Sequence, residues 1–119
     1  SWLGYRENPF EAMLEFKPAA EIKKVVLSYA NNHGSYLMPP ATVEVWAGSG
    51  PEKLKLITTK KVDQPSGYEM QRLKFVSLDL QPGTYGYIKV VARPVARLPE
   101  WHSGKGQKGW LFIDELFFY

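Results

Sequence analysis

Two loop-like segments of this sequence gather the side chains best suited to holding a ligand. One reads ANNHGSY over residues 30–36, and the other reads LPEWHSGKGQKGW over residues 98–110. Tryptophan and tyrosine rings can lie flat against the apolar C–H face of a sugar. Histidine, asparagine, arginine and lysine can hydrogen-bond its hydroxyl groups, and charged groups make the stronger bonds. The residue types therefore predict a sugar-binding site drawn from Asn32, His33, Tyr36, Arg93, Trp101, His102 and Lys105.

Some of these side chains have a purely structural interpretation as well. Trp101 could plug the base of a long loop instead of stacking on a ligand, and His33 and His102 could be incidental surface residues. The surroundings of Trp101, His102 and Tyr36 distinguish the two interpretations. A shared, open, concave patch favours sugar binding, whereas burial inside the domain favours packing.

The glycine-rich part of the second segment is not a phosphate-binding loop. Such a loop reads G-x-x-x-x-G-K-[ST] and leads into a helix. Here GKGQKGW lacks the final hydroxyl residue, and a strand-like apolar run follows it. We expect its glycines to allow positive φ in successive turns.

The sequence also lacks the residue patterns of common catalytic sites. It has no cysteine and no G-x-S-x-G nucleophile motif. Its two histidines show neither the H-x-x-x-H nor the H-E-x-x-H spacing of metal sites. Asp114 and Glu115 are neighbours on a predicted strand, so they point to opposite faces unless a bulge intervenes. We therefore predict a chain without catalytic activity.

The elements that must position the candidate residues are strands, because apolar residues recur with period two. Ala12, Leu14 and Phe16 share one face, and the segment around KPAA (17–20) reads as a turn. KLKLITT alternates lysine with leucine, which is typical of a strand with one face in water. The predicted strands cover 12–16, 21–30, 42–46, 53–59, 71–80, 85–93 and 110–119.

Within these strands the alternation also predicts which residues face inward. Those residues are Val25, Leu27 and Tyr29, Val43 and Val45, and then Leu73 and Phe75, with Leu78 and Leu80 joining after a slip of one position. Seven or eight short strands separated by Gly- and Pro-rich turns indicate an antiparallel sandwich or barrel.

Length and composition are those of one globular domain over residues 1–119. The chain is 45% hydrophobic and 23% charged, with a net charge of +3. The nearest approach to a basic block is formed by Lys53, Lys55, Lys60 and Lys61, which we interpret as solvated strand faces and not as a nucleic-acid footprint. No apolar run approaches the ~18 residues that a membrane-spanning helix needs. The opening SWLGY has no methionine, so we expect a piece of a larger protein.

The order of motifs resembles a known family. WLGY, FEAMLEF, IKKVVLSYA, YLMPPATVEVWAGSG, YIKVVARP and LPEWHSGKGQKGWLFIDELFFY follow one another as in discoidin or coagulation-factor type C domains, which are galactose-binding-like β-sandwiches. The chain is most similar to family 32 carbohydrate-binding modules, especially those C-terminal to bacterial β-hexosaminidases of the chitobiase type. The resemblance implies a jelly-roll sandwich of about eight strands without catalytic activity.

The resemblance also implies a site and a setting. Such modules bind galactose-type or N-acetylated sugars in loops at one end of the sandwich, and Asn32, His33, Arg93 and Trp101 could match their polar and aromatic roles. Glu115 matches a ligand of the structural calcium common in the family. The parent would be a glycan-processing enzyme that is secreted, periplasmic or on the surface of a bacterium. The alternative is a structural domain that packs on a neighbouring catalytic domain and binds no sugar.

Overall fold

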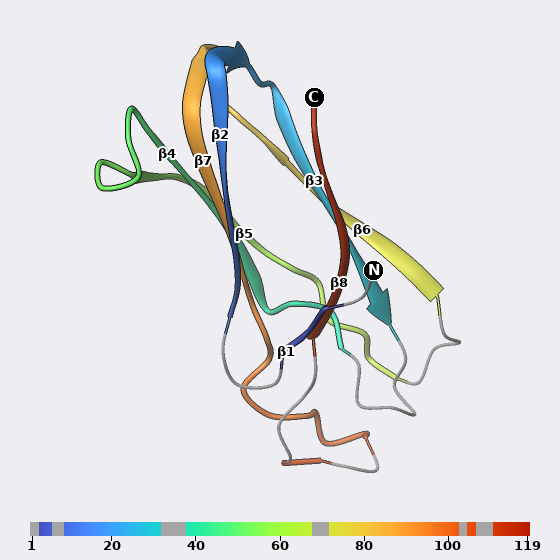
Figure 1. Cartoon of the computed structure of the whole chain (residues 1–119). Coiled ribbons are helices and arrows are strands. Elements are labelled where there is room, and N and C mark those ends of the chain that lie inside the picture. Colours follow the sequence, from blue (N-terminus) through green and yellow to red (C-terminus); the bar gives the residue numbers. More distant parts are fainter. Residues whose placement is uncertain (1–2, 6–8, 32–37, 68–71, 103–104, 107–110) are drawn as a thin grey trace.

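The computed structural model describes residues 3–5, 9–31, 38–67, 72–102, 105–106 and 111–119. In this part of the chain the regular elements are eight strands packed as two sheets (Figure 1). The strands are β1 (Leu3–Tyr5), β2 (Phe10–Glu21), β3 (Lys24–Asn31), β4 (Thr42–Gly48), β5 (Lys55–Lys61), β6 (Arg72–Asp79), β7 (Thr84–Arg93) and β8 (Leu111–Phe118). The predicted all-β sandwich is confirmed. Within the described ranges no helix is long and apolar enough to cross a membrane.

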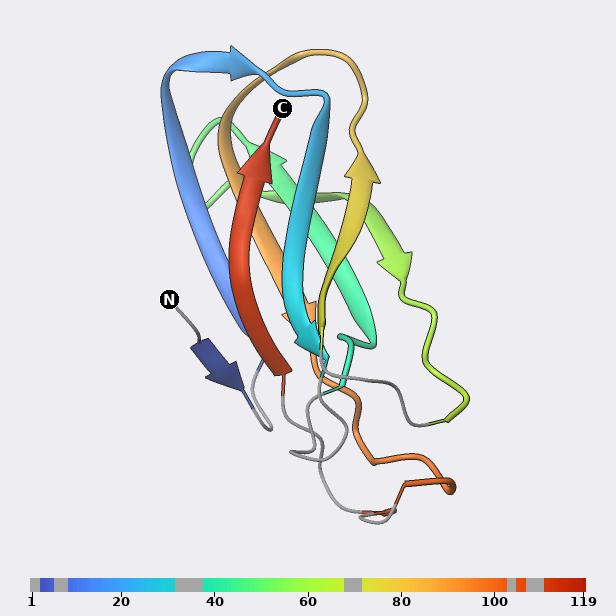
Figure 2. The same cartoon turned by 90° about the vertical axis from the view of Figure 1, so that its right-hand side faces the viewer.

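Each sheet has four strands, and neighbouring strands are antiparallel. The first sheet has the order β1-β8-β3-β6 and the second the order β2-β7-β4-β5. The odd-numbered strands run towards one end of the sandwich, and the even-numbered strands leave from it (Figure 2). The connections that follow β1, β3, β5 and β7 therefore all start at this end, which we call the loop end.

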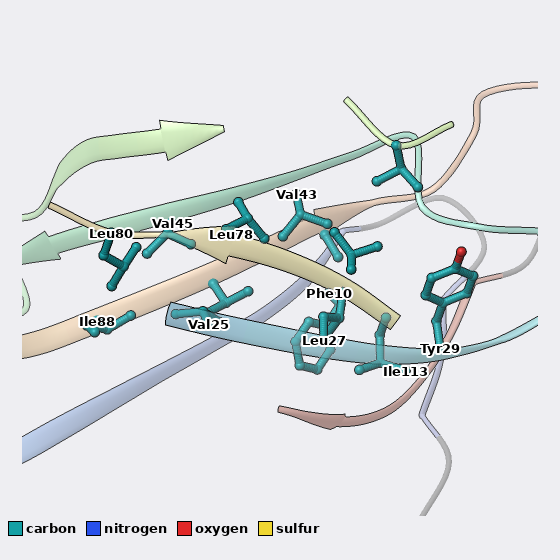
Figure 3. Packing of buried hydrophobic residues seen from close by; sticks show 14 of the residues in the cluster. Phe10, Val25, Leu27, Tyr29, Val43, Val45, Leu78, Leu80, Ile88 and Ile113 are labelled. Carbon is teal, nitrogen blue, oxygen red and sulfur yellow. The ribbon is translucent and has the colours of Figure 1, made fainter. Parts of the chain in front are cut away.

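The core lies between the inward faces of the two sheets (Figure 3). Val25 and Leu27 in β3 and Val43 and Val45 in β4 are 0% exposed. Burying a side chain of this size contributes roughly 1.5–3 kcal/mol. Tyr29 is buried too and stands beyond Leu27 in Figure 3. The predicted inward faces of β3 and β4 are confirmed.

The prediction of which β6 residues face inward is wrong for the first half of the strand. Leu73 is 43% exposed and Phe75 is 61% exposed, whereas Val76 is buried together with Leu78 and Leu80. The pairing of β3 with β6 runs without a break, so no slip of one residue occurs. Val76, Leu78 and Leu80 form an unbroken alternating set, and their burial turns Leu73 and Phe75 to the outside.

Strand β5 also differs from simple alternation. Trp46 of β4 lies opposite Leu56, but Val45 lies opposite Thr58, so Ile57 is an extra residue. This bulge turns Ile57 against the core and leaves Leu56 48% exposed. The lysine–leucine alternation predicts that Leu56 faces inward, but in the structure Ile57 is the residue that faces the core.

Strand β2 is longer than predicted, because it continues through the segment expected to be a turn. Its pairing with β7 runs to Glu15 and resumes at Ala20 after a register shift. Pro18 lies within the unpaired stretch, where its lack of an N–H costs no ladder hydrogen bond. Because β2 is an edge strand, this irregularity interrupts only one ladder.

Candidate functional site

The predicted site residues divide into those that the structure describes and those that it does not. Asn32, His33 and Tyr36 lie outside the described residues. Arg93 is the last residue of β7, at the loop end. The other three, Trp101, His102 and Lys105, belong to the connection from β7 to β8. The topology therefore brings the described candidates to one end of the sandwich.

Backbone hydrogen bonds join the described residues 98–102 to 105–106, and we call this stretch the 98–106 loop. The N–H of His102 donates to the carbonyl of Pro99 at 3.0 Å, and the N–H of Lys105 donates to the carbonyl of His102 at 3.0 Å. The N–H of Gly106 donates to the carbonyl of Leu98 at 3.2 Å and closes the segment. Gly106 has a φ of 80°, which glycine adopts without strain. The positive φ expected in these turns is confirmed at Gly106.

Two buried side chains anchor the 98–106 loop to the domain. Leu98 is buried, and His102 is only 2% exposed. The interpretation of His102 as an incidental surface residue is therefore wrong. With so little surface exposed, its imidazole offers almost nothing to a ligand in this arrangement, so its predicted contact with a sugar gains no support.

Trp101 lies beside the buried imidazole but keeps part of its own surface. It is half-buried, and the centres of the Trp101 and His102 rings are 5.6 Å apart at an angle of 48°. The indole thus combines features of both interpretations, because one part packs on the loop and another part meets solvent. Lys105 is exposed, and its Nζ lies 3.8 Å from a carboxylate oxygen of the exposed Glu100. An ion pair so open to water is weak and leaves the ammonium group accessible.

Arg93 lies on the outer face of the second sheet, where it pairs with Glu44 of β4. Its Nε donates to Oε2 of Glu44 at 3.1 Å, and its Nη2 donates to Oε1 at 3.4 Å. The indole N–H of Trp46 donates to the same Oε1 at 3.1 Å. Lys89 lies over the Trp46 ring, with its Nζ 5.6 Å from the ring centre. The guanidinium predicted to meet a sugar is thus held by a carboxylate, although its side chain is half exposed.

These contacts set the charge state of Glu44. The hydrogen bond from Arg93 lowers the pKa of Glu44 below its usual range, against the opposing effect of partial burial, and the hydrogen bond from Trp46 adds to the lowering. Because this pKa is lower in the folded state than in the unfolded chain, the stabilisation is complete well above about pH 4.3, the pKa of an ordinary glutamate. It is lost as the pH falls through the pKa of the folded state.

Glu44→Gln is expected to cost at most about 1 kcal/mol of unfolding free energy at neutral pH, because the pair is partly open to solvent. The difference between the parent and the variant should shrink as the pH is lowered from neutral to acid, because the Glu44 carboxyl becomes protonated in the folded state only below its lowered pKa. Urea unfolding at the two pH values measures this difference. Glu52→Gln, at an exposed position in the connection between β4 and β5, is the control. An equal effect of both substitutions at both pH values would contradict the role of the pair.

The acidic pair on β8 departs from strict alternation. Ser28 of β3 lies opposite Glu115 and Tyr29 lies opposite Ile113, so Asp114 is an extra residue in a bulge. The Ser28 hydroxyl lies 3.4 Å from Oδ2 of Asp114 and accepts the backbone N–H of Glu115 at 2.9 Å. Within the described ranges no group of three His, Cys, Asp or Glu side chains could hold a metal. Calcium takes 6–8 oxygen ligands, so a calcium ion at Glu115 would need further oxygens, and it stays a prediction.

Sequence reasoning missed the pocket that the structure shows between β5 and β6. Its lining includes Lys60, Lys61, Lys74 and Phe75. The sequence alone predicts only a solvated strand face at the first two. The available signal was that a lysine pair ends β5 while a lysine next to an aromatic residue begins β6. That signal becomes meaningful only once the two strand edges are known to face each other.

Comparisons with known proteins support the same architecture. The sequence matches no protein-family model and no curated protein. Among solved structures, a family 32 module from Clostridium perfringens in complex with GalNAc-β-1,3-galactose superposes with a TM-score of 0.63 at 16% identity, covering 100% of this chain and 75% of that one. The family 32 module of AlyQ in complex with 4,5-unsaturated mannuronic acid gives 0.62 at 15% identity, covering 100% and 77%.

A third solved structure matches the resemblance drawn from the motifs. The C-terminal domain of a chitobiase from Bacteroides fragilis superposes with a TM-score of 0.55 at 15% identity, covering 100% of this chain and 74% of that one. Identities this low establish the fold and leave the function to be argued from the site. The eight strands, their order in two sheets and these superpositions together show that the chain has the discoidin-like β-sandwich fold of family 32 carbohydrate-binding modules.

Proposed function

We propose that this chain is a non-catalytic carbohydrate-binding module whose loop end holds the sugar. The observation that carries the proposal is the partly exposed indole of Trp101, set at the loop end by a hydrogen-bonded loop on a rigid sandwich. An aromatic surface with fixed orientation can stack on a sugar ring at little entropic cost. Solved domains of the same fold are described in complex with GalNAc-β-1,3-galactose and with 4,5-unsaturated mannuronic acid, which supports a glycan as the ligand class.

The finer proposal concerns the ligand and the parent protein. We propose a galactose-type or N-acetylated sugar, with Trp101 as the platform and with Lys105 and Arg93 as polar contacts. Asn32, His33 and Tyr36 remain proposed contacts from the preceding connection. The parent would be a secreted, periplasmic or cell-surface glycan-processing enzyme such as a β-hexosaminidase. The same fold occurs beside a catalytic domain in the solved AlyQ chain that contains an alginate lyase domain, of which this chain covers 26%.

The test is binding to a panel of galactosyl and N-acetylglucosaminyl sugars by affinity electrophoresis or a glycan array. Weak binding in the millimolar range is expected, because a shallow site buries little of the ligand. Trp101→Ala should weaken binding about 2–10-fold through lost stacking, with an unchanged unfolding temperature. Trp46→Ala removes an indole from the outer face of the second sheet and serves as the matched control. Absence of binding to the whole panel would contradict the proposal. Unfolding by Trp101→Ala would favour the packing interpretation.

The alternative function, docking on a neighbouring domain without sugar binding, has one observation in its favour. The outer face of the first sheet exposes Leu73 and Phe75 on β6, and Tyr119 follows β8 with its ring stacked on Phe117 at 6.5 Å. Leu73 and Phe75 lie two residues apart on the same outward side of β6, and neighbouring exposed apolar side chains of this size favour a protein contact. Leu73→Ser with Tyr119→Ser would leave sugar binding intact if the loop end is the site.

A further inference from the structure

A pocket opens at the seam where the edge strands of the two sheets face each other. Strand β5 is the last strand of the second sheet, and β6 is the last strand of the first. The pocket between them has a volume of about 270 Å³. Pockets that bury drug-sized molecules measure roughly 300–1,000 Å³, so this one suits a ligand of about one sugar ring. Among the described residues, none that lines this pocket belongs to the 98–106 loop.

One part of the pocket wall is apolar and firmly held. Tyr29, Val62 and Val76 line it and are buried members of the core cluster. The backbone N–H of Val62 donates to the carbonyl of Ala41 at 3.0 Å, which fixes the chain just after β5. Phe75 also lines the pocket but remains 61% exposed. A large aromatic ring left in water on a rigid strand is a ready surface for stacking.

Three ammonium groups line the same pocket against one carboxylate. The cations are Lys60, Lys61 and Lys74, and the carboxylate is Asp63. Within the described part of the chain, neither Lys60 nor Lys61 lies within ion-pair distance of an acidic side chain. Lys60 donates from Nζ to the backbone carbonyl of Ser77 at 3.0 Å, which holds its ammonium group across the seam. Among the described residues, the pocket therefore presents the positive charge of Lys60 and Lys61 without a paired carboxylate.

We propose that this seam pocket is a second ligand site and that it takes an acidic sugar, meaning a pyranose that carries a carboxylate or a sulfate. The apolar face of the ring lies on Phe75, and Lys61 and Lys60 hold the anionic group. A neutral sugar would offer Lys60 and Lys61 no anionic group, and a bare inorganic anion would leave Phe75 unused. The combination of a cationic rim with an aromatic wall fits a ligand that has both an anion and an apolar ring face.

The test is titration of the intact chain with three oligosaccharides of equal length: a galacturonate, a sulfated galactan and a neutral galactan. Binding of at least one acidic ligand is expected, with an affinity that falls as salt is raised. Comparison of the galacturonate with the sulfated galactan shows which anion the site prefers. Because a neutral galactan is also expected to bind at the loop end, the deciding comparison uses Trp101→Ala, and equal binding of the neutral and the acidic oligosaccharides by that variant would overturn the proposal.

Variants locate the binding. Lys61→Gln is expected to weaken acidic-sugar binding about 2–5-fold, and Phe75→Ala about 2–10-fold. Both side chains are exposed, so neither change should lower the unfolding temperature. Lys55→Gln removes the same charge from the other end of β5 and is expected to have little effect. If Lys55→Gln weakens acidic-sugar binding as much as Lys61→Gln does, the sugar responds only to the overall charge of the protein and the proposal is wrong.

The loop end and the seam pocket can fail separately. Loss of acidic-sugar binding in Trp101→Ala, with full binding in Phe75→Ala, would place the acidic sugar at the loop end and refute the seam site. Retained acidic-sugar binding in a chain that binds no neutral sugar would refute only the loop-end proposal. An acidic peptide that displaces the sugar from Phe75 and Lys61 with higher affinity would identify the pocket as a peptide site instead.

Discussion

Leu27→Ala is expected to lower the free energy of unfolding by about 2–5 kcal/mol. Leu27 is 0% exposed and lies in β3, between Val76 of β6 and Leu116 of β8. Hydrogen-bonded strands on both sides prevent the backbone from collapsing into the space that the lost atoms leave. A domain is stable by only about 5–15 kcal/mol, so this change removes a large share of the total.

Urea unfolding followed by tryptophan fluorescence measures the effect of Leu27→Ala. Leu56→Ala deletes the same atoms from a leucine that is 48% exposed on β5. It should change stability by no more than about 0.5 kcal/mol. Similar losses of unfolding free energy in the two variants would mean that Leu27 does not lie in the core between the two sheets.

Gly48→Ala is the second change with a large expected effect, at about 1–3 kcal/mol of lost stability. A Cβ at Gly48 would collide with the carbonyl oxygen of Lys53. The same Cβ would lie 2.8 Å from the carbonyl carbon of Lys53 and 3.2 Å from Cα of Leu54. These are backbone atoms, so no side-chain rotation relieves the contact. The connection from β4 to β5 would have to move as a whole.

Gly50→Ala supplies the matched control for Gly48→Ala, because a Cβ at Gly50 meets nothing within 4 Å. Replacing a glycine at an unstrained open position is neutral or stabilises by up to about 1 kcal/mol. Thermal unfolding of both variants should therefore show a lower midpoint for Gly48→Ala only. A lower midpoint for Gly50→Ala would show that the connection tolerates no side chain, whatever its position.

Alternation predicted the fold well where only one face of a strand is apolar. In β4 the aliphatic residues Val43, Val45 and Ala47 all have one parity, and their only hydrophobic neighbour of the other parity is Trp46, so the alternation favours Val43 and Val45 as the inward residues. In β6 apolar residues occur at both parities, and the sequence alone could not decide between Phe75 and Val76. The choice depends on continuous pairing with β3, which is a property of the assembled sheet.

The candidate site could be predicted only to the level of the connection. Trp101 and His102 were correctly placed in one loop, but the burial of His102 depends on the hydrogen bonds that close the 98–106 loop. Such bonds leave no periodic signal in a sequence. The seam pocket was beyond sequence reasoning for a different reason. It joins the end of β5 to the start of β6, and its volume depends on how far apart the two sheets hold their edges.

The place of β8 in the first sheet has a consequence for the order of folding. It lies between β1 and β3, and its bonds to β3 join residues far apart in the chain, such as Ser28 and Glu115, which are 87 positions apart. While a ribosome is still making residues 1–110, β3 can pair with β6, but its other edge stays open. Contacts of such long range also slow folding. The sandwich therefore closes only after synthesis has passed β8, and until then the bare edge of β3 needs protection from other strands.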